Sequence, residues 1–395
     1  MIMTNRVSSI PRRVVADCVK TESDFLQLEK DWNRLVMESA RPNPFLTWEW
    51  VSTWWQYFGG NSTLFVIVIR DDTDRVVGIA PLHLVMRRAL GVIPVRTVEF
   101  LGYRGSKVCA DHLDFLTLEE NRKTIVSLLL REIFEKGDQW DALVLADIAE
   151  ESMVPDLLEQ IQTESGTQLR CAPLQRCPYI SLPSHWEILL SSIKANYRNN
   201  VKRRRDKLSR DFRVRFDWDC SPRQVAPHLE LLANLHSSSR NRKGQTGNFR
   251  YKTYYDFHRA VAERMARSGY LYLARLDCNE LPVAAFYGYH FGGRLFGYQT
   301  GFDANWAQRG VGAVLQAMVF EDVIERLHDT EYDFLRGDES YKYTWKARQR
   351  LTRTVWHWNN SFSARMASAE FAARHTVATL RSRLPARSAW FQTIK

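Results

Sequence analysis

The two halves of the chain contain the same local pattern. The sequences LFVIVIRDDTDRVVGIA at residues 64–80 and LYLARLDCNELPVAAFY at 271–287 align without a gap. Each reads as an apolar strand, a turn of Asp, Asn or Pro residues and a second strand. Farther along each half, WDALVL at 140–145 and YDFLRG at 332–337 share an aromatic residue, an Asp and a Leu at equal spacing. This repetition predicts two copies of one structural unit.

Apolar periodicity predicts helices around the repeated strands. A helix is expected before the last strand of each copy, at 119–135 and at 311–327, so that each copy runs strand, strand, strand, helix, strand. Helices are also expected before the hairpins, at 22–38, 47–57, 185–210, 223–239 and 251–267. Helices alternating with short strands indicate an α/β fold class.

The segment between the copies lacks a sustained period. Residues 155–183 contain Gly166, Pro173, Pro178 and Pro183, which is typical of a crossing segment. We therefore expect an N-terminal module, a linker, a C-terminal module and a basic tail, at residues 1–154, 155–183, 184–345 and 346–395.

Composition limits the class of protein. A chain of 395 residues has room for two domains, and 45% hydrophobic with 25% charged residues is typical of a folded soluble protein. The longest apolar candidate, 76–86, is too short for a membrane span, and the start has no signal-peptide core. A cytoplasmic location is therefore expected. The six cysteines form no C-x-x-C pair and lie near no histidine at metal spacing, so neither a metal site nor a disulfide framework is expected.

Several segments resemble the GNAT acyltransferases, and more narrowly the tandem-GNAT, Fem-type branch that includes acetyltransferases associated with cellulose and exopolysaccharide biosynthesis. The resemblance covers nearly the whole chain up to about Trp345. The segments that carry it are NPFLTWEWVSTWWQYFG (43–59), GIAPL (78–82), FLG (100–102), Cys177-Pro178, YQTGFD (298–303) and DFLRGDESYKYTW (333–345).

This resemblance implies two tandem GNAT-like modules with mixed, mostly antiparallel sheets flanked by helices. It also implies an N-acetyltransferase that moves an acetyl group from acetyl-CoA, or another acyl-CoA, to a primary amine, such as that of an amino sugar or polysaccharide precursor, without a metal. Two alternatives stay open. One is tRNA-dependent aminoacyl transfer to a cell-wall precursor, and the other is a non-catalytic scaffold for polysaccharide synthesis at a membrane.

The loop AQRGVGAV at 307–314 precedes a predicted helix and contains two glycines. Glycines let backbone N–H groups approach a diphosphate, and the helix dipole favours negative charge there. We therefore expect the cofactor to be held by Arg309, Gly310, Val311, Gly312 and Ala313. The loop departs from the family pattern, because Ala307 stands where Gln or Arg is usual. A tight strand-to-helix turn is the alternative explanation. The first copy lacks Gly-x-Gly at 102–115, so one donor site per chain is expected.

The cluster RGDESYKYTW at 336–345 follows the last strand of the second copy, where ligands gather in open α/β sheets. Asp338 or Glu339 could accept the proton of the amine, and Tyr341 could protonate the departing thiolate. A backbone N–H around Tyr298 could stabilise the oxyanion. Lys342 and Tyr298 are expected to contact substrate. The alternative is a charged exposed turn.

His236 ends an apolar helical run and could orient substrate or serve as a base, although a structural role is equally compatible with its position. The predicted acceptor is a small molecule or glycan precursor. Neither DNA nor RNA is expected as the partner.

The net charge of +10 is unevenly distributed. The tail, 346–395, has ten Lys or Arg and one acid, Glu370, for a net of +9, and 194–215 has ten Lys or Arg against Asp206 and Asp211. The second block could bind CoA phosphates, a nucleotide-linked sugar or RNA, or be a solvated helix face. The tail could contact a membrane surface or a protein, or be a frayed end.

Overall fold

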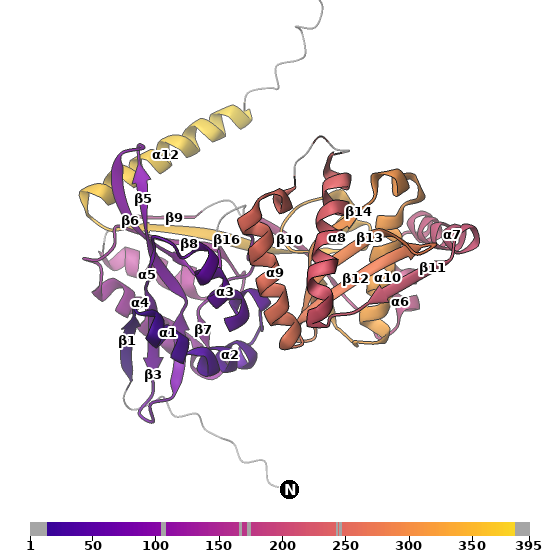
Figure 1. Cartoon of the computed structure of the whole chain (residues 1–395). Coiled ribbons are helices and arrows are strands. Elements are labelled where there is room, and N and C mark those ends of the chain that lie inside the picture. Colours follow the sequence, from indigo (N-terminus) through magenta and orange to yellow (C-terminus); the bar gives the residue numbers. More distant parts are fainter. Residues whose placement is uncertain are drawn as a thin grey trace, which may run out of the picture.

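The computed structural model describes residues 14–103, 108–165, 168–171, 175–241, 244 and 247–383. The molecule has two lobes (Figure 1). The N-terminal half contains β1 (Val15–Val19), α1 (Glu22–Gln27), α2 (Glu29–Glu38), η1 (Pro44–Leu46), α3 (Trp48–Phe58), β2 (Thr63–Leu64), β3 (Val66–Arg70), β4 (Val76–Ala80), β5 (Leu82–Ala89), β6 (Ile93–Phe100), β7 (Leu116–Thr117), η2 (Glu119–Asn121), α4 (Arg122–Glu135), β8 (Ala142–Ile148), α5 (Val154–Ser165) and β9 (Gln168–Cys171).

Most of the C-terminal half forms the second lobe, drawn in red and orange in Figure 1, whereas its last helix packs on the first lobe. It contains β10 (Gln175–Ser181), α6 (Trp186–Ser192), α7 (Ala195–Asp211), β11 (Val214–Trp218), α8 (Pro222–Asn241), η3 (Asn248–Arg250), α9 (Lys252–Arg267), β12 (Leu271–Cys278), β13 (Leu281–Phe291), β14 (Arg294–Phe302), η4 (Ala304–Arg309), α10 (Val311–Glu325), β15 (Glu331–Asp333), α11 (Ser340–Tyr343), β16 (Arg348–Trp358) and α12 (Phe362–Arg383).

The predicted repeat is present in the strand pairing. β3 pairs antiparallel with β4, and β12 pairs antiparallel with β13. In each half a helix then leads to a parallel strand, with α4 between β6 and β8 and α10 between β14 and β15. The first copy has more strands than predicted, because Pro81 separates β4 from β5 and the short strands β2 and β7 are additional. The last strands are also offset, since Asp141 precedes β8 whereas Asp333 ends β15.

A single sheet crosses both halves. β16 pairs with β10 of the C-terminal half and with β8 and β9 of the N-terminal half. It is drawn as a long yellow strand from one lobe to the other (Figure 1). This corrects the expectation of a separate tail from residue 346, because residues 348–358 complete the sheet. The expected linker, 155–183, likewise contains most of α5 together with β9 and β10. Residues 384–395 of the predicted tail lie outside the described residues.

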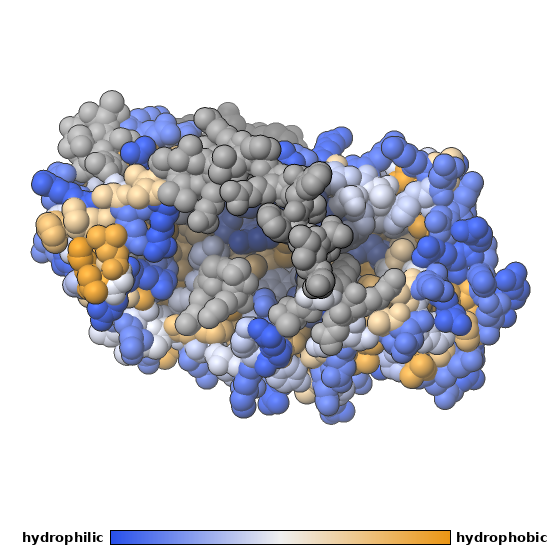
Figure 2. Space-filling view, turned by 90° about the horizontal axis from the view of Figure 1, so that it is seen from above, coloured by the Kyte–Doolittle hydropathy of each residue, from blue (hydrophilic) through white to orange (hydrophobic). Residues whose placement is uncertain are grey.

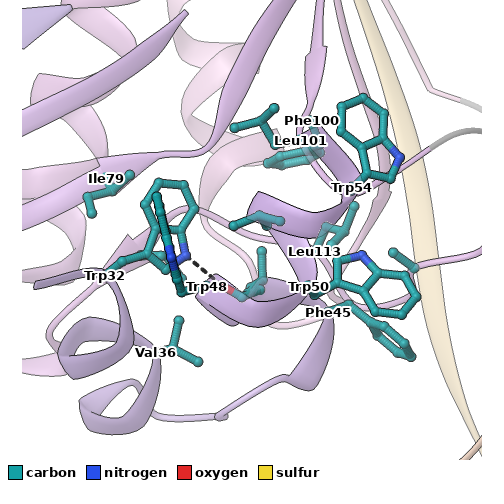
Figure 3. Packing of buried hydrophobic residues seen from close by; sticks show 14 of the residues in the cluster. Trp32, Val36, Phe45, Trp48, Trp50, Trp54, Ile79, Phe100, Leu101 and Leu113 are labelled. Atoms are coloured by element: carbon teal, nitrogen blue, oxygen red, sulfur yellow. Dashed lines mark hydrogen bonds between the residues drawn. The ribbon is translucent and has the colours of Figure 1, made fainter. Parts of the chain in front are cut away.

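Tryptophans dominate the core of the N-terminal half. Trp32, Trp50 and Trp54 are almost fully buried, and the Nε1 of Trp32 donates to the carbonyl of Leu46 at 2.7 Å (Figure 3). The helix α3 begins where the Thr47 hydroxyl accepts from the amide of Trp50. Trp50 also packs edge-on against Tyr298 of β14, with ring centroids 5.9 Å apart. The aromatic core of one half therefore supports a strand of the other.

Within the described residues, every helix is too short or too polar to cross a bilayer.

Candidate active site

Two parallel strands separate at the centre of the C-terminal half. β14 and β15 pair only from Arg294 to Phe296, opposite Glu331 to Asp333. Beyond this point β14 continues to Phe302 and pairs only with β13. Its register with β13 shifts at Tyr298, which is a β-bulge. The other edge of β14 therefore offers unpaired backbone groups to whatever lies between the strands.

A cavity of about 630 Å³ occupies this opening. Its lining combines aromatic rings with polar side chains, which is typical of a site for a polar organic substrate. Both halves contribute to it, since Cys109 and Asp111 come from the N-terminal half. Among the predicted site residues, the cavity is lined by His236, Tyr298, Gly312, Ala313, Glu339, Tyr341 and Lys342.

The first turn of α10 lies at the same opening. Gly310 precedes the helix with φ of 70°, a conformation that favours glycine, and it has no side chain to cap the helix. The amides of Val311 and Gly312 have no partner inside the helix. The amide of Ala313 instead donates to the Gly310 carbonyl at 3.0 Å, and the amide of Gly310 donates to the Ala307 carbonyl. Of the five predicted residues, Val311 and Gly312 thus keep the amides that suit an anion.

Arg204 of the basic helix α7 lies over this turn. A Cβ added to Gly310 would be 1.6 Å from the Nη1 of Arg204, so the guanidinium occupies the space next to Gly310 that a side chain would fill. The predicted arginine is placed elsewhere, because Arg309 stacks over Trp306 and Phe212, with its Cζ 4.8 and 5.5 Å from the ring centroids. The cation at the helix N-terminus therefore comes from a helix about one hundred residues earlier, at Arg204.

Lys342 is the central residue of the loop after β15. Its side chain is 4% exposed, and its Nζ donates to the carbonyls of residues 334, 335, 336 and 337 at 3.1–3.3 Å. The Nζ also lies 3.0 Å from the carboxylate of Glu339. These contacts fold the loop around the ammonium group. The structure thus gives Lys342 a role in shaping the cavity wall, in addition to the predicted substrate contact.

The two candidate carboxylates have different surroundings. Glu339 lines the cavity, whereas Asp338 is outside it and pairs with Arg176 at 2.7 Å. The hydroxyl of Tyr343 also donates to Asp338, and these bonds lower the pKa of this carboxyl. Asp338 is therefore a poor proton acceptor. Desolvation and the neighbouring Glu339 raise the pKa of Tyr341 to about 12, so its hydroxyl keeps its proton at neutral pH.

His236 is buried beside β14. A Cβ on Gly301 would be 2.5 Å from the backbone N of His236, so α8 lies directly against the strand. Burial and the nearby Arg240 lower the pKa of His236 to about 4, which leaves a neutral ring at pH 7. The hydroxyl of Tyr298 donates to the Cys109 carbonyl at 3.2 Å and so fixes the strand to the N-terminal half.

An ion pair between the halves forms part of the cavity wall and was missed by the sequence analysis. The Nε of Arg336 donates to Asp111 at 2.6 Å, and its Nη2 lies 2.9 Å from Asp147. Both carboxylates raise the pKa of Arg336. Asp111 lies in the stretch 102–115, where the sequence shows no sustained periodicity. The only available signal was its position in the stretch that corresponds to the phosphate loop of the second copy.

Comparisons with known proteins agree with this geometry. Residues 195–343 match the acetyltransferase (GNAT) domain family. Among solved structures, the chain is similar to one described as FemX, with 11% identity over 83% of this chain and 95% of that one and a TM-score of 0.58. It is also similar to a conserved protein of unknown function from Bacteroides thetaiotaomicron VPI-5482, with 12% identity, 87% and 100% coverage and a TM-score of 0.54. No curated protein matches the sequence.

The fold is thus that of two tandem GNAT-like modules, as the resemblance implied. The GNAT domain in the C-terminal half makes the protein an acyltransferase. No group of three or more potential metal ligands occurs among the residues that the structure describes.

Proposed function

We propose that the protein transfers an acetyl group from acetyl-CoA to a primary amine in the cytoplasm. The observation that carries this proposal is the continuity of one site. The uncapped turn of α10, the free edge of β14 and the polar loop after β15 all border the same cavity. A nucleotide diphosphate and an extended thioester arm need this combination, because one end requires anion donors and the other a row of amide groups.

The residues at the turn fit the diphosphate of CoA. The amides of Val311 and Gly312 and the guanidinium of Arg204 would hold it, and bound acyl-CoA supplies a thioester carbonyl to the site. Backbone N–H groups on the free edge of β14 would stabilise negative charge on the carbonyl oxygen. Glu339 would accept the proton of the amine, directly or through water, and Tyr341 would provide a proton to the leaving group.

The acceptor would enter from the junction of the two halves. The wall there has the Asp111–Arg336 pair and tyrosine rings, which support a polar acceptor such as an amino sugar or a polysaccharide precursor. Rings and planar charged groups pack against sugar faces and bind their hydroxyls. The place of this reaction in polysaccharide biosynthesis belongs to the same proposal.

The test combines CoA binding with thiol release. Isothermal calorimetry with CoA should show binding that Arg204→Gln weakens about tenfold, because a charge-assisted contact to phosphate is lost. The neighbouring Arg203→Gln is the matched control, since Arg203 is exposed on the same helix and should leave affinity unchanged. Thiol release from acetyl-CoA is then measured with amino sugars, amino acids and polyamines. Absence of CoA binding by the wild-type protein would overturn the proposal.

A second candidate, aminoacyl transfer from tRNA, is favoured by one observation. Lys202, Arg203, Lys207 and Arg210 are exposed on α7, beside the cavity helix. Phosphate contacts by such cations make RNA binding steeply salt-dependent. Filter binding with a bulk tRNA probe at low and high salt separates the two candidates, because an acetyltransferase should bind CoA in preference to tRNA at physiological salt.

A further inference from the structure

The turn of the β5–β6 hairpin places an exposed leucine in a left-handed backbone conformation. Leu90 and Gly91 have φ of 50° and 77°, and the amide of Val92 donates to the Ala89 carbonyl at 3.1 Å, so this is a β-turn whose two central residues are both left-handed. Asn or Asp followed by Gly is the usual choice there, and leucine is strained in this conformation. Leu90 is nonetheless 57% exposed, and so its side chain gains little from the fold.

Other apolar side chains are exposed on the same hairpin. Met86 is 56% and Val92 is 69% exposed. Of the large hydrophobic side chains exposed in the described residues, these three fall within seven positions of one hairpin. Exposed apolar residues grouped at a protruding tip are typical of an interaction site.

The hairpin is held firmly in place by α12. The carboxylate of Glu370 accepts from the amide of Leu90 at 2.8 Å, and Ala89 and Val95 of the hairpin are buried with Trp358 and Ala364. Figure 2 looks down on this side of the molecule, where apolar atoms lie among hydrophilic ones at the end occupied by α12 and the hairpin. The apolar tip is therefore presented on a rigid support.

The charges around the tip are positive at the surface. Arg87 is 54% exposed whereas its partner Glu99 is 13% exposed, and Arg374 is 77% exposed whereas its partner Glu370 is 16% exposed. Arg88 is exposed as well. The apolar tip is therefore surrounded by exposed guanidinium groups. This arrangement complements a surface whose outer layer is anionic and whose interior is apolar.

We propose that the β5–β6 hairpin docks the protein on the surface of an anionic membrane. Leu90, Val92 and Met86 enter the boundary between headgroups and acyl chains, while the arginines contact lipid phosphates. The site is separate from the acyl-transfer cavity, and the inference does not depend on the proposed function.

Vesicle flotation of the full chain tests this proposal. Wild-type protein should float with vesicles of phosphatidylcholine mixed with phosphatidylglycerol, and high salt or phosphatidylcholine alone should weaken binding. The double variant Leu90→Asn/Val92→Thr should lower binding about tenfold, because two apolar side chains no longer enter the lipid. Asn suits the left-handed turn position and Thr keeps the branched Cβ of Val92, so the melting temperature should be unchanged or higher.

The matched control is Leu281→Asn, a 52% exposed leucine beside the turn of another hairpin, which should bind vesicles as the wild type does. Equal flotation of the double variant and the wild type would overturn the proposal. Failure of the wild-type protein to bind anionic vesicles would also overturn the proposal, even if the hairpin bound a protein instead.

Discussion

Lys342 is a buried cation. Its ammonium group donates to backbone carbonyls and pairs with the carboxylate of Glu339, which is itself exposed. We expect Lys342→Met to lower the free energy of unfolding by about 3 kcal/mol, because several carbonyls would lose their donor inside the protein. Urea denaturation measures this loss. Lys346→Met is the control, since Lys346 is exposed and should change stability by less than about 0.5 kcal/mol. A small effect at Lys342 would show that water replaces the ammonium group.

The neighbouring carboxylates Asp338 and Glu339 should differ in activity. Glu339→Gln should lower kcat/KM for thiol release by about 100-fold, because the cavity would lose its proton acceptor. Asp338→Asn should change kcat/KM by less than about threefold, since Asp338 lies outside the cavity and pairs with Arg176. Equal activity in both variants would remove Glu339 from the proposed mechanism.

The strand β16 is central to the sheet, although it follows the residues that carry the family resemblance. It lies between β10 and β8 in the sheet, and Arg350 on it lies 2.8 Å from both Asp333 and Glu331. A chain that ends at Trp345 should therefore fail to fold, because a central strand and the cation of a buried carboxylate would be missing. Circular dichroism and solubility on expression provide the readout.

The control for this truncation is a chain that ends at Arg383, which keeps β16 and α12. It should retain its cooperative unfolding transition. A cooperative transition in the shorter chain would instead mean that each half folds without β16.

The whole molecule contains several buried histidines that are neutral in the folded state. Burial lowers the pKa of His228, His236 and His357 to about 4 and that of His258 to about 3, from an ordinary value of 6.5. Between about pH 6.5 and 4 the unfolded chain therefore binds more protons than the folded protein, so stability falls as the pH is lowered. We expect the melting temperature to drop steeply between neutral pH and about pH 5.

Substitution separates this effect from general acid sensitivity. His357→Phe, with Phe134 and Trp140 as neighbours, should make the melting temperature less dependent on pH. His328→Gln should leave the pH dependence unchanged, because His328 is exposed. Identical pH profiles for both variants and the wild type would exclude buried histidines as the cause.

Local sequence patterns were sufficient to predict the repeated hairpins, most helices and the loop that opens α10. These features depend on local periodicity, capping residues and glycines, which act between residues close in the chain. The helix expected at 185–210 nevertheless divides into α6 and α7, and that expected at 22–38 divides at Leu28. The positions of the helices were therefore predictable, whereas the breaks within them, which depend on packing, were not.

The side chains that meet in the cavity come from elements that no local pattern links. Arg204 reaches Gly310 from another helix, Asp111 reaches Arg336 from the other half, and β16 joins the two halves in one sheet. Each of these contacts joins residues that are far apart in sequence. Their pairing depends on how helices and strands pack after they form, and no local pattern in the sequence records it.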